Sequence, residues 1–156
     1  MKNNVQEQFA ILKQIDKQQD ELYHRIAVQI GISETALWVL YNLCDSDEVF
    51  TQNSLAELWC IPKQTVNSAI TSLVKMGYVY LEQMAAARNS KAILLTEEGT
   101  AFCQKAIMPV LAAEQSAFLQ LTEEERETFI ALLKKQDLFL QKELNRLMED
   151  MRSGAK

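Results

Sequence analysis

The chain has 156 residues, of which 48% are hydrophobic and 24% are charged, with only four Gly and two Pro. This length suits one folding unit, and the composition excludes disordered, collagen-like and low-complexity proteins and favours long helices. The formal net charge of −5 argues against a generally basic nucleic-acid binder. The charge is uneven, however, because residues 51–96 hold four basic and two acidic side chains while the segments on either side are net acidic. The only net-positive part of the chain is therefore its centre.

The N-terminal residues have no apolar core of the signal-peptide type, and no apolar run approaches the roughly 20 residues needed to span a bilayer. We therefore expect a cytoplasmic protein. Its only histidine, His24, has no cluster of Cys or carboxylate residues at ligand spacing, and the chain has no Gly-rich phosphate loop. The sequence thus gives no indication of a metal site, a cofactor or an enzymatic activity.

The three cysteines, Cys44, Cys60 and Cys103, lie far apart in the sequence, and none belongs to a C-x-x-C motif. The simplest interpretation is that all three are reduced, buried, small apolar residues. The alternative is that one of them senses an oxidant.

Two helices are predicted before residue 50. The first ends at Gly31, a residue suited to a left-handed helix cap, and Ser33 is a good N-cap for the second. The acidic run Asp45-Ser46-Asp47-Glu48 then indicates a solvated loop. The apolar stripe of the first helix has helical spacing and consists of Val5, Phe9, Leu12, Ile15, Leu22, Ile26 and Ile30.

A helix-turn-helix is predicted next. Thr51 can cap a short third helix that extends to Trp59, and Cys60-Ile61 forms a tight connection. Pro62, which has no N–H to donate, is expected to be the first residue of a fourth helix, which Gly77 ends. Two short helices joined by a few residues are typical of this motif.

The fourth helix has one apolar and one polar face. Helical spacing predicts that Val66, Ala69, Ile70, Leu73 and Val74 are buried. The opposite face is polar but nearly uncharged, which suits the reading of base edges in a DNA groove better than it suits an ordinary solvated surface. Its residues are Gln64, Thr65, Asn67, Ser68 and Thr71, and we expect Thr51, Lys63 and Lys75 beside them to contact phosphates.

The apolar period changes from helical to alternating after Gly77. Residues 79–82 and 91–95 therefore predict two antiparallel strands joined by a loop that lacks the Asn-Gly or Asp-Gly of a tight turn. A helix-turn-helix followed directly by a hairpin is a winged helix. Arg88 and Lys91 are the basic residues of this wing.

Two more helices complete the chain. Thr96 can cap the first of them, in which Pro109 should produce a kink, and Thr122 with Glu125 forms a capping box for the second. The last helix has Phe129, Leu133, Leu140, Leu144, Leu147 and Met151 on one side.

The terminal helices are longer than a domain of this size needs. Burying a Leu or Phe contributes roughly 1.5–3 kcal/mol, so their apolar stripes should be covered. We expect the terminal helices of two chains to interleave in a homodimer; the alternative is that they pack on each other within one chain. The predicted organisation is an N-terminal dimerisation helix (1–32), a winged helix-turn-helix (33–96) and C-terminal dimerisation helices (97–156).

This order of elements resembles the MarR family of bacterial transcription regulators. The resemblance covers nearly the whole chain, and its most specific parts are S-L-A-E-L at residues 54–58, P-K-Q-T-V-N at 62–67, L-V-K-M-G-Y-V at 73–79 and L-T-E-E-G at 95–99. It implies a mainly α fold with a small β-hairpin wing, homodimers, and double-stranded DNA with a pseudo-palindromic operator as the partner. One feature departs from the family pattern: the Asp and Arg usual in the wing are replaced by Ala87 and Asn89.

The resemblance also implies a small-molecule effector pocket between the dimer helices and the winged helix. Its candidate lining residues are Tyr23, Trp38, Tyr41 and Trp59, which could equally be core aromatics. Peroxide-sensing relatives use a cysteine in the first helix, which has none here. We therefore expect a sequence-specific, homodimeric regulator, a repressor that an effector releases from DNA. The alternative, motivated by the acidic total and the missing wing pair, is a winged-helix dimer with weakened DNA contact that serves protein assembly.

Overall fold

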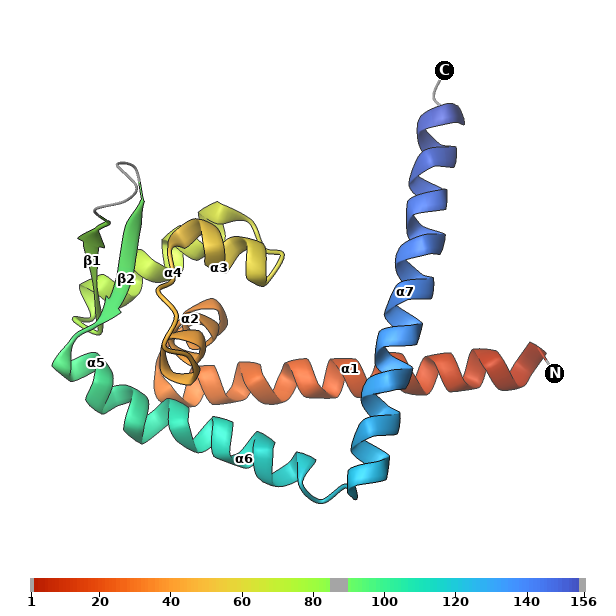
Figure 1. Cartoon of the computed structure of the whole chain (residues 1–156), viewed down its shortest axis with the longest axis horizontal. Coiled ribbons are helices and arrows are strands. Elements are labelled where there is room, and N and C mark those ends of the chain that lie inside the picture. Colours follow the sequence, from red (N-terminus) through yellow and green to blue (C-terminus); the bar gives the residue numbers. More distant parts are fainter. Residues whose placement is uncertain (1, 85–89, 155–156) are drawn as a thin grey trace. The chain divides into compact units, whose positions relative to one another are not determined.

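The computed structural model describes residues 2–84 and 90–154 of the chain. The chain divides into two compact units between Leu111 and Ala112. Helices α1 to α5, both strands and the first residues of α6 belong to the first unit, and α7 belongs to the second (Figure 1).

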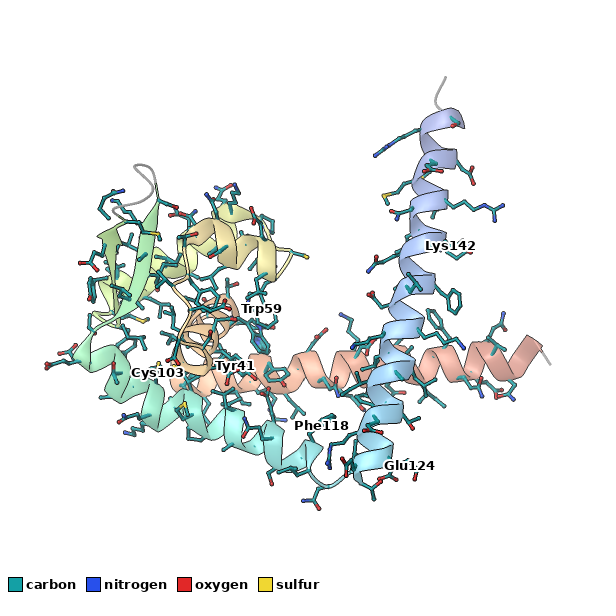
Figure 2. All side chains as sticks on the ribbon, viewed as in Figure 1. Tyr41, Trp59, Cys103, Phe118, Glu124 and Lys142 are labelled. Atoms are coloured by element: carbon teal, nitrogen blue, oxygen red, sulfur yellow. The ribbon has the colours of Figure 1, made fainter. Side chains whose placement is uncertain are left out.

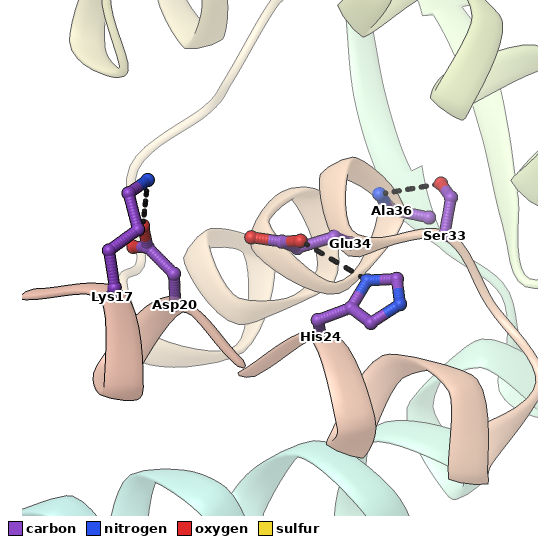
Figure 3. Close-up of polar contacts among 6 residues, drawn as sticks. All are labelled: Lys17, Asp20, His24, Ser33, Glu34 and Ala36. Carbon is purple, nitrogen blue, oxygen red and sulfur yellow. Dashed lines mark hydrogen bonds and ion pairs between the residues drawn. The ribbon is translucent and has the colours of Figure 1, made fainter. Parts of the chain in front are cut away.

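The first two helices have the predicted boundaries. Helix α1 spans Lys2–Ile30 and ends at Gly31, whose φ of 78° is the left-handed conformation that glycine adopts without strain. Helix α2 spans Glu34–Asp45. The Ser33 side chain caps α2 by accepting a hydrogen bond of 3.2 Å from the backbone N–H of Ala36 (Figure 3).

Helix α3 (Gln52–Leu58) and helix α4 (Lys63–Lys75) form the predicted helix-turn-helix. A capping box begins α3, because the Thr51 side chain accepts from the backbone N–H of Ser54 while the Ser54 side chain accepts from that of Thr51. The role predicted for Pro62 is wrong by one position. Its ψ of 136° is extended, so Pro62 is the N-cap of α4 and Lys63 is the first helical residue.

Gly77 ends α4 as predicted, in a left-handed conformation with φ 79°. Its N–H donates to the Val74 carbonyl at 3.0 Å, and the N–H of Tyr78 donates to the Leu73 carbonyl at 3.0 Å. These two bonds form a Schellman motif, which reverses the chain so that the wing begins at once.

The wing is the predicted antiparallel hairpin of β1 (Val79–Gln83) and β2 (Lys91–Leu95). Val79 pairs with Leu95, and Gln83 pairs with Lys91. The predicted loop between the strands falls largely on residues 85–89, which lie outside the described residues.

The segment before α3 attaches the wing to the helices. The backbone N–H of Ile93 donates to the Phe50 carbonyl at 2.9 Å, and Thr51 forms an isolated antiparallel bridge with Ala92. The residue that caps α3 is therefore also held by β2. In Figure 1 the hairpin stands beside α4 within the first unit.

After the wing, α5 (Glu97–Phe102), a π-helical segment η1 (Cys103–Ile107) and α6 (Met108–Phe118) follow without a break. Thr96 caps α5 as predicted by accepting from the backbone N–H of Gly99 at 2.9 Å. The kink predicted at Pro109 stays a prediction, and η1 ends two residues before this proline. Proline donates no hydrogen bond and its ring crowds the carbonyl four residues earlier, so the preceding turn widens.

The core of the first unit lies where α2, α4, the wing and η1 meet. The last turns of α1 reach it through Tyr23, Ile26, Ala27 and Ile30. Its largest fully buried side chains are Leu37, Leu40, Leu55, Leu73, Ile93, Ile107, Val66 and Val79.

Helix α7 (Glu123–Gly154) begins with the predicted capping box. The Glu125 carboxylate accepts from the backbone N–H of Thr122 at 2.8 Å, and the Thr122 hydroxyl accepts from that of Glu125 at 3.3 Å. Hydrogen bonds to the carboxylate from the backbone N–H and the side chain of Thr122 lower the pKa of Glu125. No residue of α7 is buried, and its predicted apolar stripe is exposed along its whole length.

Among residues 2–84 and 90–154, no single helix is long and apolar enough to cross a membrane. The segments Asn4–Ile30 and Glu34–Asp45 meet the length and composition criteria only together, as a pair bent by 88°. The same residues contain no group of three or more His, Cys, Asp or Glu side chains arranged to hold a metal ion.

Candidate nucleic-acid interface

The outer face of α4 is the centre of the candidate interface. Val66, Ala69, Ile70 and Leu73 are buried and hold the helix against the core. Val74, predicted to be buried with them, has 43% of its surface exposed because it lies at the edge of the apolar stripe. The predicted polar face is entirely exposed and consists of Gln64, Thr65, Asn67, Ser68 and Thr71.

Two hydroxyl groups on this face bind the helix backbone. Ser68 donates to the Gln64 carbonyl at 2.9 Å, and Thr71 donates to the Asn67 carbonyl at 2.8 Å. Their oxygens remain able to accept hydrogen bonds from outside. The amides of Gln64 and Asn67 each have both a donor and an acceptor, so they are the groups on this face suited to bidentate contact with adenine.

The residues predicted to contact phosphate have different positions. Lys63 and Lys75 are exposed at the two ends of α4, and Lys91 is exposed on β2. Thr51 is half-buried, and its hydroxyl takes part in the capping box, so its first role is to hold α3. Arg88, Ala87 and Asn89, the other wing residues singled out in the sequence, lie outside the described residues.

Sequence reasoning missed the residues that connect α3 to α4 and to the wing. The Gln52 amide donates to the Lys63 carbonyl at 3.1 Å, which ties the start of α3 to the start of α4. A pocket of about 250 Å³ opens beside it and is bordered by all three elements. The sequence contained one indication of this contact, which is that Gln52 directly follows Thr51, the N-cap of α3. The pocket is lined by Thr51, Gln52, Asn53, Ile70, Leu81, Ser90, Lys91 and Ile93.

The four predicted effector-site aromatics form one cluster around Trp38. Its ring centroid lies 4.7 Å from that of Tyr23, 5.5 Å from that of Tyr41 and 5.2 Å from that of Trp59. Figure 2 labels Tyr41 and Trp59 within this part of the first unit. None of the four side chains is fully buried, and Trp59 has 38% of its surface exposed. The cluster thus lies at the edge of the core rather than within it.

The cysteines do not share one environment, contrary to the expectation that all three are buried. Cys60 is exposed in the turn between α3 and α4 and has a left-handed φ of 50°. Cys103 is buried and Cys44 is half-buried. Both residues pack in the core of the first unit, although they are far apart in the sequence.

His24 lies on α1 with its Nδ1 3.7 Å from a carboxylate oxygen of Glu34 (Figure 3). The His24 side chain is exposed, and that of Glu34 is half-buried. This pair is a surface contact between α1 and α2 and is not part of a catalytic triad.

The comparisons with known proteins agree with this geometry. Residues 30–88, which contain the helix-turn-helix and the first strand of the wing, match the family model described as MarR family. The solved structure of NMB1585, a MarR family regulator from Neisseria meningitidis, is similar with a TM-score of 0.73 and 20% identity over 89% of this chain and 97% of that one. The chain is thus similar to the MarR family in residues 30–88 and shares the fold of these solved structures.

Other MarR structures cover the chain to a similar extent. The S. aureus MepR–DNA complex has a TM-score of 0.69 and 23% identity over 84% of this chain and 96% of MepR. AbsC, a MarR family transcriptional regulator from Streptomyces coelicolor, has a TM-score of 0.73 and 19% identity over 87% and 93% of the two chains. A search among curated proteins gives no match.

The likeness to these solved structures confirms the predicted winged-helix fold. The chain has the fold of solved MarR transcriptional regulators.

Proposed function

We propose that the protein is a homodimeric, sequence-specific DNA-binding regulator that acts in the cytoplasm as a repressor and is released from DNA by a small molecule. The observation that carries this proposal is the exposed, uncharged polar face of α4 in a MarR winged helix. MepR, which has the same fold, was solved in complex with DNA.

The DNA-binding residues have separate roles. Gln64, Asn67 and the hydroxyl residues Thr65, Ser68 and Thr71 read base edges in the major groove. The cations at the ends of α4 and on the wing neutralise phosphates and set the register of the protein on the duplex. The phosphate contacts are made by Lys63, Lys75, Arg88 and Lys91, with Thr51 beside them.

The dimer is formed by the terminal helices. On α1, Val5 and Phe9 have 66% and 53% of their surface exposed, and the whole stripe of α7 is similarly exposed. Contiguous apolar faces of this extent mark interaction surfaces, because leaving them in water loses roughly 1.5–3 kcal/mol per large side chain. In the proposed organisation, segments 1–32 and 97–156 form the dimer and 33–96 binds DNA.

Two copies of α4 related by a two-fold axis would enter successive major grooves roughly 34 Å apart, which requires a pseudo-palindromic operator. An effector that binds the cluster of Tyr23, Trp38, Tyr41 and Trp59 would favour dimers whose α4 helices have a different separation. The effector shifts the balance between the DNA-binding and the released dimer only if it binds these two states with different affinities.

Selection of binding sites from random DNA tests the proposal. The expected result is an inverted repeat with half-sites one helical turn apart and an affinity that falls steeply as salt rises, since bound phosphates release counterions. Recovery of unrelated sequences with no common half-site would contradict groove reading. Recovery of no DNA at all would favour the alternative, a protein-assembly module, which the net charge of −5 motivates.

A further inference from the structure

Two hydroxyl groups on the exposed face of α4 present acceptors, and not donors, to the outside. The Ser68 hydroxyl donates to the Gln64 carbonyl at 2.9 Å. The Thr71 hydroxyl donates to the Asn67 carbonyl at 2.8 Å. A carbonyl oxygen can only accept, so the single proton of each hydroxyl is directed into the helix. Each residue therefore presents to a DNA groove only the remaining lone pairs of its oxygen.

An acceptor of this kind is selective in the major groove. Guanine presents the acceptors N7 and O6 there, and thymine presents the acceptor O4, so neither base can donate to the oxygen of Ser68 or Thr71. Adenine and cytosine each present an exocyclic amino group, N6 and N4, which can donate. The two hydroxyls could bind guanine or thymine only by turning their protons outward, which breaks their bonds to the carbonyls of Gln64 and Asn67.

The remainder of this face also disfavours guanine. Arg and Lys make the commonest specific contact with guanine, and residues 64–74 contain neither of them. The exposed amides on this face, Gln64 and Asn67, match the donor and acceptor pattern of adenine. The amides and the two hydroxyls therefore agree in their preference for bases that carry an amino group.

We propose that Ser68 and Thr71 read the exocyclic amino groups of adenine or cytosine at two neighbouring base pairs of each half-site. The two residues lie about 4.5 Å apart along the helix axis at 1.5 Å per residue, close to the roughly 3.4 Å between base pairs. A single acceptor does not distinguish N6 of adenine from N4 of cytosine. These two positions therefore tolerate either base on the strand that is read, and they reject guanine and thymine. This assignment rests on the proposed DNA-binding function.

Methylation of these amino groups should prevent the contact. A base-paired amino group uses one of its two protons for the pair and presents the other to the major groove. A methyl group on N6 or N4 of the paired base takes the place of this second proton, so the amine has nothing left to donate to Ser68 or Thr71. The affinity of the protein for its operator is therefore expected to fall when the amines that it reads are methylated.

Methylated duplexes test this contact with the wild-type protein. A duplex with half-sites selected from random DNA would be synthesised with N6-methyladenine or N4-methylcytosine at one base pair at a time. Binding should weaken roughly two- to tenfold for each hydrogen bond lost, at no fewer than two neighbouring base pairs. The same modification between the half-sites is the control and should leave the affinity unchanged. Equal affinity for all methylated half-sites would overturn the proposal.

Ser68→Ala and Thr71→Val assign the two base pairs to the two hydroxyls. Both residues are exposed, and valine retains the shape of threonine, so each change removes little besides the hydroxyl. Each variant should bind unmodified DNA roughly two- to tenfold more weakly and become insensitive to methylation at one base pair while it stays sensitive at the other. Sites selected with the wild type should accept adenine and cytosine interchangeably at these two positions. Full methylation sensitivity of both variants at every base pair would overturn the role of the hydroxyls.

The reading of amino groups and the proposed function fail in different ways. Specific binding of unmodified duplexes that neither methylation nor the two substitutions alter would overturn the reading of amino groups and leave the DNA-binding function standing. If no unmodified duplex is bound specifically, both are overturned.

Discussion

The amides of Gln64 and Asn67 and the ammonium group of Lys63 occupy one turn of α4 but have different chemistry. All three side chains are exposed on the helix that the core supports through Val66 and Ile70. An amide matches the donor and acceptor pattern of an adenine edge, whereas an ammonium group interacts with any phosphate. Neighbouring residues on one face should therefore affect specificity and affinity separately.

Gln64→Ala and Asn67→Ala should each relax base preference at one position of the half-site. Loss of a bidentate contact should reduce discrimination against the wrong base by about 1–3 kcal/mol. Lys63→Ala should weaken all DNA sequences about equally and lower the slope of log affinity against log salt by about 1. Titrations of the selected site and of single-base variants at several salt concentrations measure both effects. If all three variants behave like the wild type, α4 does not read DNA with this face.

At the scale of elements, α4, the wing and α5 meet in a closely packed junction near the candidate interface. The Thr96 hydroxyl donates to the Gly77 carbonyl, and the Thr96 N–H donates to the Tyr78 carbonyl at 3.1 Å. A Cβ atom on Gly99 would lie 1.8 Å from the same Tyr78 carbonyl oxygen. Glycine is required at this position because the backbone of α5 directly contacts the root of the wing.

Gly99→Ala should lower the free energy of unfolding by at least about 1–3 kcal/mol, since backbone atoms must shift to admit the methyl group. Urea unfolding at one fixed protein concentration measures this change. Gly154→Ala is the matched control, because a Cβ atom there meets nothing within 4 Å. Equal unfolding midpoints for the two variants would show that the contact between Gly99 and Tyr78 relaxes without cost.

At the scale of the whole molecule, α7 presents apolar side chains along its full length without burying any of them. The stripe includes Leu140 and Leu144, which have 46% and 47% of their surface exposed. Lys142 and Glu149 project from the opposite side of the helix by the period of 3.6 residues per turn. If the stripe forms the dimer interface, substitutions within it should weaken the dimer, and substitutions on the opposite side should not.

The double variant Leu140→Gln/Leu144→Gln should weaken the dimer by at least tenfold, because four apolar side chains are lost from a symmetric interface. Sedimentation across a range of protein concentrations measures the dissociation constant. The double variant Lys142→Gln/Glu149→Gln is the control, since it introduces the same residues and preserves net charge, and it should behave like the wild type. A wild-type protein that is monomeric at all concentrations would contradict the dimer.

Local sequence was sufficient for most of the elements. Ser33, Thr51, Thr96 and Thr122 cap helices through hydrogen bonds that span only three residues, and Gly31 and Gly77 end helices through their own backbone freedom. Such interactions depend on neighbours in the chain, so pattern and residue type predict them. The polar face of α4 followed in the same way from helical spacing.

Only the tertiary structure decided which distant residues meet. The aromatic cluster around Trp38 and the contact of Gln52 with the start of α4 join segments whose separation carries no local pattern. The exposures of Val74 and Cys60 also depended on the packing of neighbouring elements. The sequence by itself thus determined the winged helix and the polar face of α4, because capping and periodicity are local, whereas the aromatic cluster required the packing of α1 against α2.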